Sequence, residues 1–347
     1  MFPSQLPQPR IVDPKAVPVL RWGIIGPGWI AERFAKALKE GTSQQLVAIA
    51  SRSQERAAAF ADKMGIPQAF GSAAELLSQP DIDAVYIATP HNHHYPDGLQ
   101  ALQAGKHVLI EKPLALNAQQ GQALAELAQA KGLLCMEAMW CDFLPKYDVI
   151  SQLLEDGVLG DLHTLLADHG EFFTPDHRIF NADLAGGPML DLGSYLIGFS
   201  IKVAGAPASI YATGQQVPGG VNGQASMLLT HHNGMHSVLN TTLFSNTPGG
   251  AVIAGRDASL NIAGSFYAPG PFTLTASQGG NVLHFDEPRN RYDQLFHEAV
   301  HFAWCVGQGK TESPVRPLSA SLATLSAMDE VRRQIGQVFN EEQNLTH

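Results

Sequence analysis

A lysine at the end of an apolar strand is the residue of this chain best placed to do chemistry. Residues 107–113 read HVLIEKP, so Lys112 follows a strand expected to be buried and precedes a proline. Ligands of open parallel sheets bind beyond the carboxyl ends of the strands, and a desolvated ammonium there can be tuned for proton transfer. Lys112 could also be a solvated cation that ends the strand, and only the surrounding pattern decides between the two.

A second pair of candidates lies in the later half of the chain. Asp191 and Tyr195 follow Gly186-Gly187 in a segment predicted to be helical through about residue 203, and their spacing puts them on one helical face. A phenol close to an ammonium has a lowered pKa and can act as a general base on a substrate hydroxyl. The simpler alternative is a packed helix tyrosine with an aspartate that only caps the helix.

The turn over residues 26–31 fits the pattern G-x-G-x-x-A between a short strand and a helix predicted for residues 30–40. The first glycine permits the tight turn, and the second lets the backbone approach a pyrophosphate. Alanine at the last position keeps the helix close to the sheet, while the helix N-terminus favours the anion. We therefore expect a dinucleotide to contact Gly26, Gly28, Trp29, Ile30 and Ala31.

The second strand ends in Ser51-Arg52, where a site for NAD usually places an acidic residue. The guanidinium of Arg52 suits the 2′-phosphate of NADP instead, by charge and by its planar fork of donors. We predict that Ser51 and Arg52 contact the cofactor and that NADP is preferred over NAD. Otherwise Arg52 is only a solvated loop cation.

The fourth strand ends in a histidine-rich turn, Thr89-Pro90 followed by HNHH up to His94. No cysteine or acidic residue has the spacing of a metal ligand beside these histidines, so we predict no metal. A turn that lines the cofactor explains the segment more simply. We therefore expect Thr89, Pro90 and His94 to contact the cofactor, together with Glu111 and Lys112.

The predicted elements place these residues in two domains. Strands and helices alternate from residue 20 to about 140, which indicates a doubly wound parallel sheet, the Rossmann arrangement. Residues 141–347 contain many successive short strands and a few helices, which is typical of an α+β domain with a large, mainly antiparallel sheet. Residues 1–19 form a proline-rich arm, either a loose tail or a strap on the body or on a partner subunit.

Bulk composition excludes several classes of protein. The formal charge is −10 with Lys and Arg scattered, which argues against a nucleic-acid partner, and no apolar run is long enough to span a membrane. The three cysteines are few and unpatterned, so we expect a reducing, cytoplasmic compartment. The expected partner is a small molecule.

These motifs together resemble the Gfo/Idh/MocA oxidoreductases, over residues 20–340 and in the right order. The resemblance rests on Gly26–Ala31, Glu111-Lys112-Pro113 and the Gly186-Gly187 segment with Asp191, Gly193 and Tyr195. Within the family, residues 136–140 (MEAMW), Tyr195 and residues 312–315 (ESPV) are most similar to the dimeric dihydrodiol dehydrogenase and NADP-dependent D-xylose dehydrogenase branch.

The resemblance implies a mechanism. Lys112 would hydrogen-bond the reacting hydroxyl, Tyr195 would take its proton as a hydride leaves for the nicotinamide, and Asp191 would orient the substrate or the lysine. It also implies an open-faced C-terminal sheet through which homodimers or homotetramers form. The candidates for the substrate wall are Trp140, Phe143, Phe173 and Arg178, together with Tyr195.

One departure bears on the substrate. Members of the dihydrodiol branch carry an arginine where this chain has Asp142, and a carboxylate pointing into the pocket would suit a hydroxyl-rich sugar. We therefore expect oxidation of an aldose at C1 to its lactone. The alternatives are a trans-dihydrodiol dehydrogenase, an NAD-dependent glycosidase on the same scaffold, and a non-catalytic sugar or nucleotide sensor.

Overall fold

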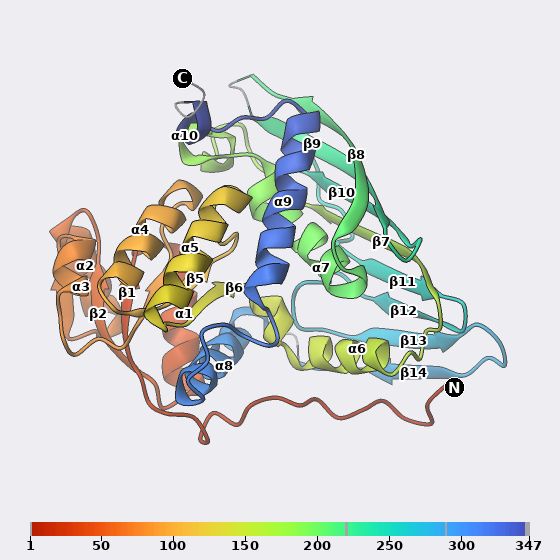
Figure 1. Cartoon of the computed structure of the whole chain (residues 1–347), viewed down its shortest axis with the longest axis horizontal. Coiled ribbons are helices and arrows are strands. Elements are labelled where there is room, and N and C mark those ends of the chain that lie inside the picture. Colours follow the sequence, from red (N-terminus) through yellow and green to blue (C-terminus); the bar gives the residue numbers. More distant parts are fainter. Residues whose placement is uncertain (1, 219–220, 289, 344–347) are drawn as a thin grey trace. The chain divides into compact units, whose positions relative to one another are not determined.

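The computed structural model describes residues 2–218, 221–288 and 290–343 (Figure 1). The chain divides into two compact units. One comprises Ile11–Phe143 and Asn290–Leu322, and the other comprises Met1–Arg10, Leu144–Arg289 and Ala323–His347. We call them the six-strand unit and the eight-strand unit after their sheets, and describe each by itself.

The six-strand unit contains an all-parallel sheet in the order β3-β2-β1-β4-β5-β6, which confirms the predicted Rossmann arrangement. Its strands are β1 (Arg21–Ile25), β2 (Gln45–Ala50), β3 (Gln68–Phe70), β4 (Ala84–Ile87), β5 (His107–Glu111) and β6 (Cys135–Ala138). Its connecting helices are α1 (Trp29–Gly41), α2 (Gln54–Met64), α3 (Ala73–Leu77), α4 (His91–Gln103) and α5 (Ala118–Lys131). The helix α4 includes most of the histidine-rich segment predicted to be a turn.

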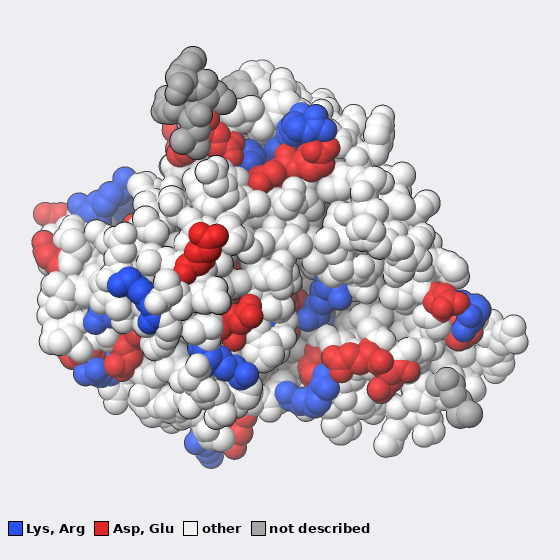
Figure 2. Space-filling model, viewed as in Figure 1, with Lys and Arg blue, Asp and Glu red and all other residues white. Residues whose placement is uncertain are grey.

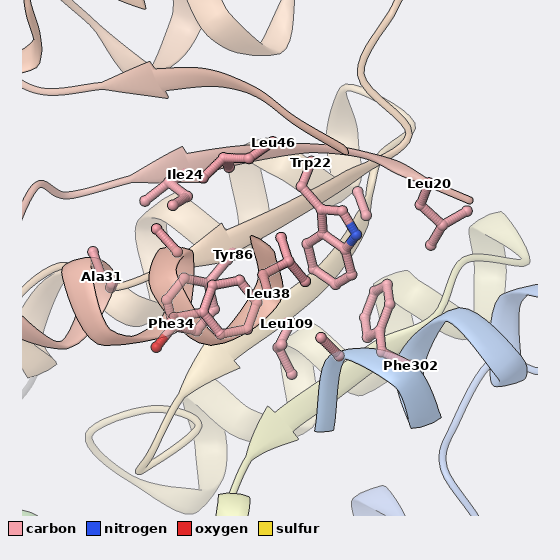
Figure 3. Close-up of a cluster of buried hydrophobic side chains, with 14 of the residues drawn as sticks. Leu20, Trp22, Ile24, Ala31, Phe34, Leu38, Leu46, Tyr86, Leu109 and Phe302 are labelled. Atoms are coloured by element: carbon pink, nitrogen blue, oxygen red, sulfur yellow. The ribbon is translucent and has the colours of Figure 1, made fainter. Parts of the chain in front are cut away.

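Aromatic packing explains why the late segment Asn290–Leu322 belongs to this unit. This segment contains the 3₁₀ turn η5 (Arg291–Leu295) and the helix α8 (Phe296–Gly307). Phe302 of α8 packs on Trp22 of β1 with ring centroids 4.8 Å apart, and Phe34 of α1 stacks on Tyr86 of β4 at 3.8 Å (Figure 3). The division differs from the expected domains 20–140 and 141–347 because this contact joins residues that are far apart in the sequence.

The eight-strand unit contains a mainly antiparallel sheet, as predicted, in the order β14-β13-β12-β11-β7-β10-β9-β8. Only the pair β7 and β10 is parallel among the described strands. The strands are β7 (Leu162–Gly170), β8 (Pro207–Gln216), β9 (Asn222–His231), β10 (His236–Thr242), β11 (Ala251–Gly255), β12 (Ala258–Ile262), β13 (Phe272–Ala276) and β14 (Val282–Phe285).

The helices of this unit include α6 (Pro145–Glu155), α7 (Ser194–Ala204) and α10 (Asn340–Gln343), and Figure 1 shows α7 beside the sheet. The helix α9 (Leu318–Gln334) begins in the six-strand segment and continues here. Three short 3₁₀ turns also occur: η1 (Trp140–Phe143) in the six-strand unit, and η2 (Arg178–Phe180) and η3 (Ala182–Leu184) in the eight-strand unit. Contacts of α7 with β7 and β10 cover one face of the sheet.

Burial alternates along the strands and separates a covered face from an open one. Leu165, Ala167 and His169 of β7 are buried, whereas Leu166 between them is exposed. In β10 the exposed Val238 pairs with Leu166 across the sheet. Exposed apolar residues therefore continue from strand to strand on the open face.

One edge of this sheet is closed by a side chain. Gln334, at the end of α9, accepts a hydrogen bond from the backbone N–H of Ala212 at 2.7 Å and donates one to the carbonyl of Ile210 at 2.8 Å. Both partners lie in the edge strand β8. The amide thus satisfies one donor and one acceptor that an edge strand would otherwise leave to solvent.

Gln8 and Arg10 of the arm contact α6. Arg10 donates from Nε to Asp148 at 3.1 Å and pairs with Glu155 at 3.2 Å, and Gln152 donates to the carbonyl of Gln8 at 2.8 Å. Of the two predicted alternatives, these contacts favour a strap on the chain's own body.

Surface and helix properties agree with the bulk composition. On the face shown in Figure 2, acidic and basic side chains are interspersed and form no large field of one sign. Within the described ranges, no helix has the length and apolar character needed to cross a membrane. The cysteines Cys135, Cys141 and Cys305 are all buried free thiols.

Candidate active site

The glycine turn after β1 leaves room for a ligand at the start of α1. Gly26 has φ +98°, and a Cβ there would lie 2.8 Å from the carbonyl oxygen of Ala88, so only glycine fits. Gly28 is the N-cap of α1 and has no side chain to bond the first N–H groups of the helix. These donors and the helix dipole suit a phosphate, so the site fits the pyrophosphate of a dinucleotide.

Two tryptophans of the predicted site share one aromatic neighbour. Trp29 at the start of α1 is half exposed and meets Tyr292 edge to face, with ring centroids 5.2 Å apart. Trp140, after β6, lies 6.0 Å from the same ring, and Phe143 packs on His301 at 5.1 Å. Sequence reasoning missed Tyr292 because it lies far along the chain in Asn290–Leu322. Ile30 is partly buried, whereas Ala31 is buried against the core.

The end of β2 carries a buried serine and an exposed arginine, Ser51 and Arg52. Asp97 of α4 accepts a hydrogen bond from the hydroxyl of Thr89 at 2.8 Å. Burial raises the pKa of Asp97, and Thr89 and the positive charge of Arg52 act in the opposite direction. The exposed guanidinium of Arg52 can therefore meet an anion at the carboxyl end of β2.

Lys112 is buried at the carboxyl end of β5, and its peptide bond to Pro113 is cis. The preceding carboxylate, Glu111, accepts a hydrogen bond from the backbone N–H of Lys112 at 3.2 Å. The other oxygen of Glu111 accepts a short hydrogen bond from the hydroxyl of Tyr86. The backbone at Lys112 is therefore held by the buried carboxylate of Glu111, which Tyr86 of the neighbouring strand orients.

His94 connects two of the predicted turns. Its Nδ1 lies 2.7 Å from the carbonyl oxygen of Pro113, and its Nε2 lies 2.9 Å from that of Thr89. Burial lowers the pKa of His94 to about 4, although the two carbonyls oppose this shift. The ring is buried between the ends of β4 and β5, so its contacts make it a positioning residue for the Lys112 turn.

A buried ion network holds the other side of the same turn. Glu137 of β6 accepts from the N–H of Leu114 at 3.0 Å, from Arg316 at 2.8 Å and from the hydroxyl of Ser321 at 2.6 Å. Burial raises the pKa of Glu137, but Arg316 and Ser321 outweigh burial and hold this pKa below its usual range. Asp142 lies 3.5 Å from Arg316 and is also buried. Its carboxylate thus lies within ion-pair distance of Arg316.

Glu298 of α8 contrasts with Glu137. Both are buried, yet neither carboxyl oxygen of Glu298 has a hydrogen-bond partner among the described residues. Burial, and then the negative charge of Glu111, raise the pKa of Glu298 well above its usual value. These two causes favour the protonated, neutral form of the Glu298 carboxyl group over the carboxylate.

In the eight-strand unit, Tyr195 belongs to an aromatic cluster with two residues that sequence reasoning missed. Its ring stacks on Tyr267 with centroids 4.7 Å apart and lies 5.7 Å from His169. His169 in turn stacks on Tyr267 at 4.2 Å. Glu171 accepts from the hydroxyl of Tyr267 at 3.1 Å and lies 3.2 Å from Nε2 of His169. All three rings are buried.

Asp191 lies in a π-helical turn, η4 (Met189–Gly193), that leads directly into α7. The predicted continuous helix is therefore replaced by a wider turn before Tyr195. Phe173 packs in a small apolar cluster with Leu192 of this turn. Arg178 is exposed on η2, and its side chain is not part of that cluster.

The predicted residues thus fall in both units. The cofactor set, Lys112, Trp140 and Phe143 belong to the six-strand unit, and Asp191, Tyr195, Phe173 and Arg178 belong to the eight-strand unit. Within the ranges that the structure describes, no three His, Cys, Asp or Glu side chains are grouped to hold a metal ion.

The parallel sheet and its glycine turn define a nucleotide-binding domain of the Rossmann type. The family model for an oxidoreductase with an NAD-binding Rossmann fold matches residues 20–139, and the GFO/IDH/MocA C-terminal domain matches residues 147–265. The chain belongs to the Gfo/Idh/MocA oxidoreductase family, as its motifs predict.

Relatives of known activity cover nearly the whole chain. The trans-1,2-dihydrobenzene-1,2-diol dehydrogenase of Mus musculus is 34% identical over 93% of this chain and 99% of its own length. A 3-ketoreductase from Actinomadura kijaniata, solved with NADP and TDP-benzene, is 29% identical with a TM-score of 0.81, over 92% of this chain and 98% of its own. A levoglucosan dehydrogenase solved with NADH and levoglucosan is 18% identical, over 92% of this chain and 98% of its own, and its TM-score of 0.83 supports the fold.

Proposed function

We propose that this protein is an NADP-dependent dehydrogenase that oxidises a hydroxyl group on a cyclic polyol or diol, with C1 of an aldose as the first candidate. The observation that carries the proposal is the buried lysine at the end of β5, which leads directly into a turn whose backbone is held by His94 at Pro113 and by Glu137 at Leu114. A backbone held in this way supports a defined position for the lysine, as orientation of a reacting oxygen requires.

In this mechanism a bound nicotinamide supplies the hydride acceptor. The ammonium of Lys112 donates a hydrogen bond to the reacting hydroxyl oxygen and stabilises the negative charge that develops there. The phenol oxygen of Tyr195, as phenolate, takes the hydroxyl proton. The carbinol carbon thereby loses one hydride and its oxygen one proton, which leaves a carbonyl group or, from C1 of a pyranose, a lactone.

Arg52 supports the choice of NADP. Its exposed guanidinium follows β2, where the ribose of a dinucleotide lies in a Rossmann site. A planar fork of donors binds a phosphate bidentately. Burial raises the pKa of the nearby Asp97 carboxyl group, and the positive charge of Arg52 acts to lower it.

A second candidate substrate is a trans-dihydrodiol. It is favoured by the dehydrogenase of Mus musculus, 34% identical, whose name specifies that activity. Both candidates carry a reacting hydroxyl next to another hydroxyl on a six-membered ring. A panel of aldoses, inositols and dihydrodiols, followed by absorbance at 340 nm with NADP and with NAD, separates them.

The mechanism is tested with Lys112→Ala and Tyr195→Phe. Each should lower kcat by about 10²- to 10⁴-fold, because each removes one group of the proton transfer. NADP affinity, measured by fluorescence titration, should change little. Lys131→Ala, which removes an exposed lysine, is the matched control. Wild-type turnover in both site variants would disprove the mechanism, and release of sugar from a glycoside without net NADPH would indicate the glycosidase instead.

We also propose that the open face of the eight-strand sheet joins copies of the chain into a homodimer or homotetramer. Tyr211, Leu228, Val238 and Leu166 are exposed and occupy one row across β8, β9, β10 and β7. A row of this kind is a typical protein interface. Light scattering of wild type and Val238→Glu tests it, since a charge in the row should yield monomers.

The buried free thiols Cys135, Cys141 and Cys305 support a reducing compartment, for which we propose the cytoplasm.

A further inference from the structure

Two buried polar atoms, one on His169 next to Tyr195 and one on the strand beside it, have no hydrogen-bond partner among the described residues. Nδ1 of His169 and Oγ1 of Thr241 form no hydrogen bond within the part of the chain that the structure describes. His169 is 3% exposed and Thr241 0%. The two residues are register partners on neighbouring parallel strands, β7 and β10, and both lie on the covered face. A buried polar group without a partner destabilises a fold by about 1–3 kcal/mol, so two in one row need a reason.

The neighbours of His169 determine which ring nitrogen carries the proton and which one is an acceptor. Glu171 accepts hydrogen bonds, so Nε2, 3.2 Å away, carries the proton that faces it. With the imidazole neutral, Nδ1 is then an acceptor. The carboxylate of Glu171 is itself held by the hydroxyl of Tyr267, and the Tyr267 ring stacks on His169 at 4.2 Å with a 25° interplanar angle. Ring and tautomer are therefore fixed before any ligand arrives.

The position of His169 relates this acceptor to the proposed chemistry. The centroid of the imidazole lies 5.7 Å from that of the Tyr195 ring, so the Nδ1 acceptor belongs to a ring next to the phenol. Thr241, in the same row, adds a hydroxyl that can donate or accept. The cluster thus offers one acceptor of fixed orientation and one hydroxyl for a group next to the one that Tyr195 would deprotonate.

We propose that His169 and Thr241 bind a second hydroxyl of the substrate, on the carbon adjacent to the one oxidised. The inference rests on the proposed function and narrows it to vicinal diols, a class that includes both aldoses and dihydrodiols. The substrate hydroxyl donates to Nδ1 of His169 and accepts from Thr241. His169 is in this view a specificity-determining residue.

The test compares substrates that differ only in the neighbouring hydroxyl: an aldose with its 2-deoxy counterpart, and trans-cyclohexane-1,2-diol with cyclohexanol. Wild-type kcat/KM should favour the diol of each pair by about 10²-fold or more, because an analogue without the hydroxyl leaves buried polar atoms unpaired. His169→Phe keeps an aromatic ring and removes the acceptor, so this ratio should fall close to one. Thr241→Val should lower it less.

The controls separate folding from recognition. His163→Phe introduces the same side chain at an exposed position of β7 and should keep the wild-type ratio. His169→Asn, which retains a polar side chain, should restore part of the preference. An unchanged ratio in folded His169→Phe would overturn the inference and indicate that the cluster holds only a buried water. Absence of turnover on every substrate would instead reject the proposed function.

Discussion

The polar groups around Lys112 and those around Tyr195 are organised in opposite ways. Around the Lys112 turn, His94 and Glu137 contact backbone groups on either side and the ion network is closed. Around Tyr195, the ring of His169 is fixed by its neighbours, but one of its atoms and one of Thr241 have no hydrogen-bond partner in the part of the chain that the structure describes. A closed network holds a reactive group in place, whereas an open one leaves positions for a ligand.

Glu298 is an exception to this contrast between the two regions. It is a buried carboxyl group in the six-strand unit, and neither of its oxygens has a described hydrogen-bond partner. Its raised pKa shows how the fold accommodates it, because a neutral carboxylic acid is far less costly to bury than a carboxylate. Lack of a partner therefore suggests a ligand position only where neighbouring groups fix the orientation, as they do at His169.

The largest expected effect comes from opening the closed network. Arg316→Met removes a cation that pairs with both Glu137 and Asp142, and should lower the free energy of unfolding by about 3–5 kcal/mol. Urea denaturation of the ligand-free protein measures it. Arg333→Met is the matched control, since its exposed pair with Glu330 should contribute about 1 kcal/mol or less. Equal losses would show that the network is not special.

Protonation of His94 should open the same region from the other side. Its pKa is about 4 in the folded state against 6.5 as the ordinary value, so protons favour the unfolded chain. The contribution is complete above pH 6.5 and is lost as the pH falls toward 4, by about 3 kcal/mol at most. Denaturation at a series of pH values should show this loss in wild type and a shallower slope in His94→Gln. Parallel curves down to pH 4 would contradict it.

Substitution of Arg52 tests the proposed contact with the 2′-phosphate of the cofactor. Arg52→Ala should weaken NADP by about 10- to 100-fold, about 1.4–2.7 kcal/mol, because a charge-assisted contact to the 2′-phosphate is lost. NAD, which lacks that phosphate, should bind the variant as well as it binds wild type. Titration with both dinucleotides measures the difference. A proportional loss for both would assign Arg52 to folding rather than to phosphate recognition.

The smallest effect probes the open cluster without any ligand. Thr241→Val removes a hydroxyl without a described partner, so it should leave stability unchanged or raise it by up to about 1 kcal/mol. Thr242→Val, the next residue of β10, removes an acceptor that bonds the N–H of Phe244 at 3.1 Å and should lower stability by about 1 kcal/mol. Thermal melts of the two variants are sufficient. A large loss in Thr241→Val would mean that its hydroxyl has a structural role.

Local signals account for most of what the sequence could predict. The glycine turn and the alternation of strands and helices each act over a few residues, and the structure contains both. Pairings between distant segments have no such signal. Glu137 and Arg316 are 179 residues apart in sequence, and nothing local links either to Lys112.

The Tyr195 cluster was missed for a related reason, although one signal was present. His169 lies on the covered face of β7, the same face as the buried Leu165 and Ala167. The alternation along the strand predicts an apolar residue at this position. A histidine there breaks the pattern and could have been singled out. The pairing with Tyr267 could not, because it depends on a loop almost a hundred residues later.

The hydrogen bonds of Gln334 to the edge strand β8 affect how the protein can aggregate. An edge strand with free peptide groups can recruit a strand from another molecule and start a cross-β assembly. Gln334 presents an amide to β8 as a neighbouring strand would, yet it belongs to a helix and offers no further edge for growth. The last turn of α9 thus blocks the addition of a further strand to β8 and protects the molecule from polymerising through this edge. The open face of the sheet remains available.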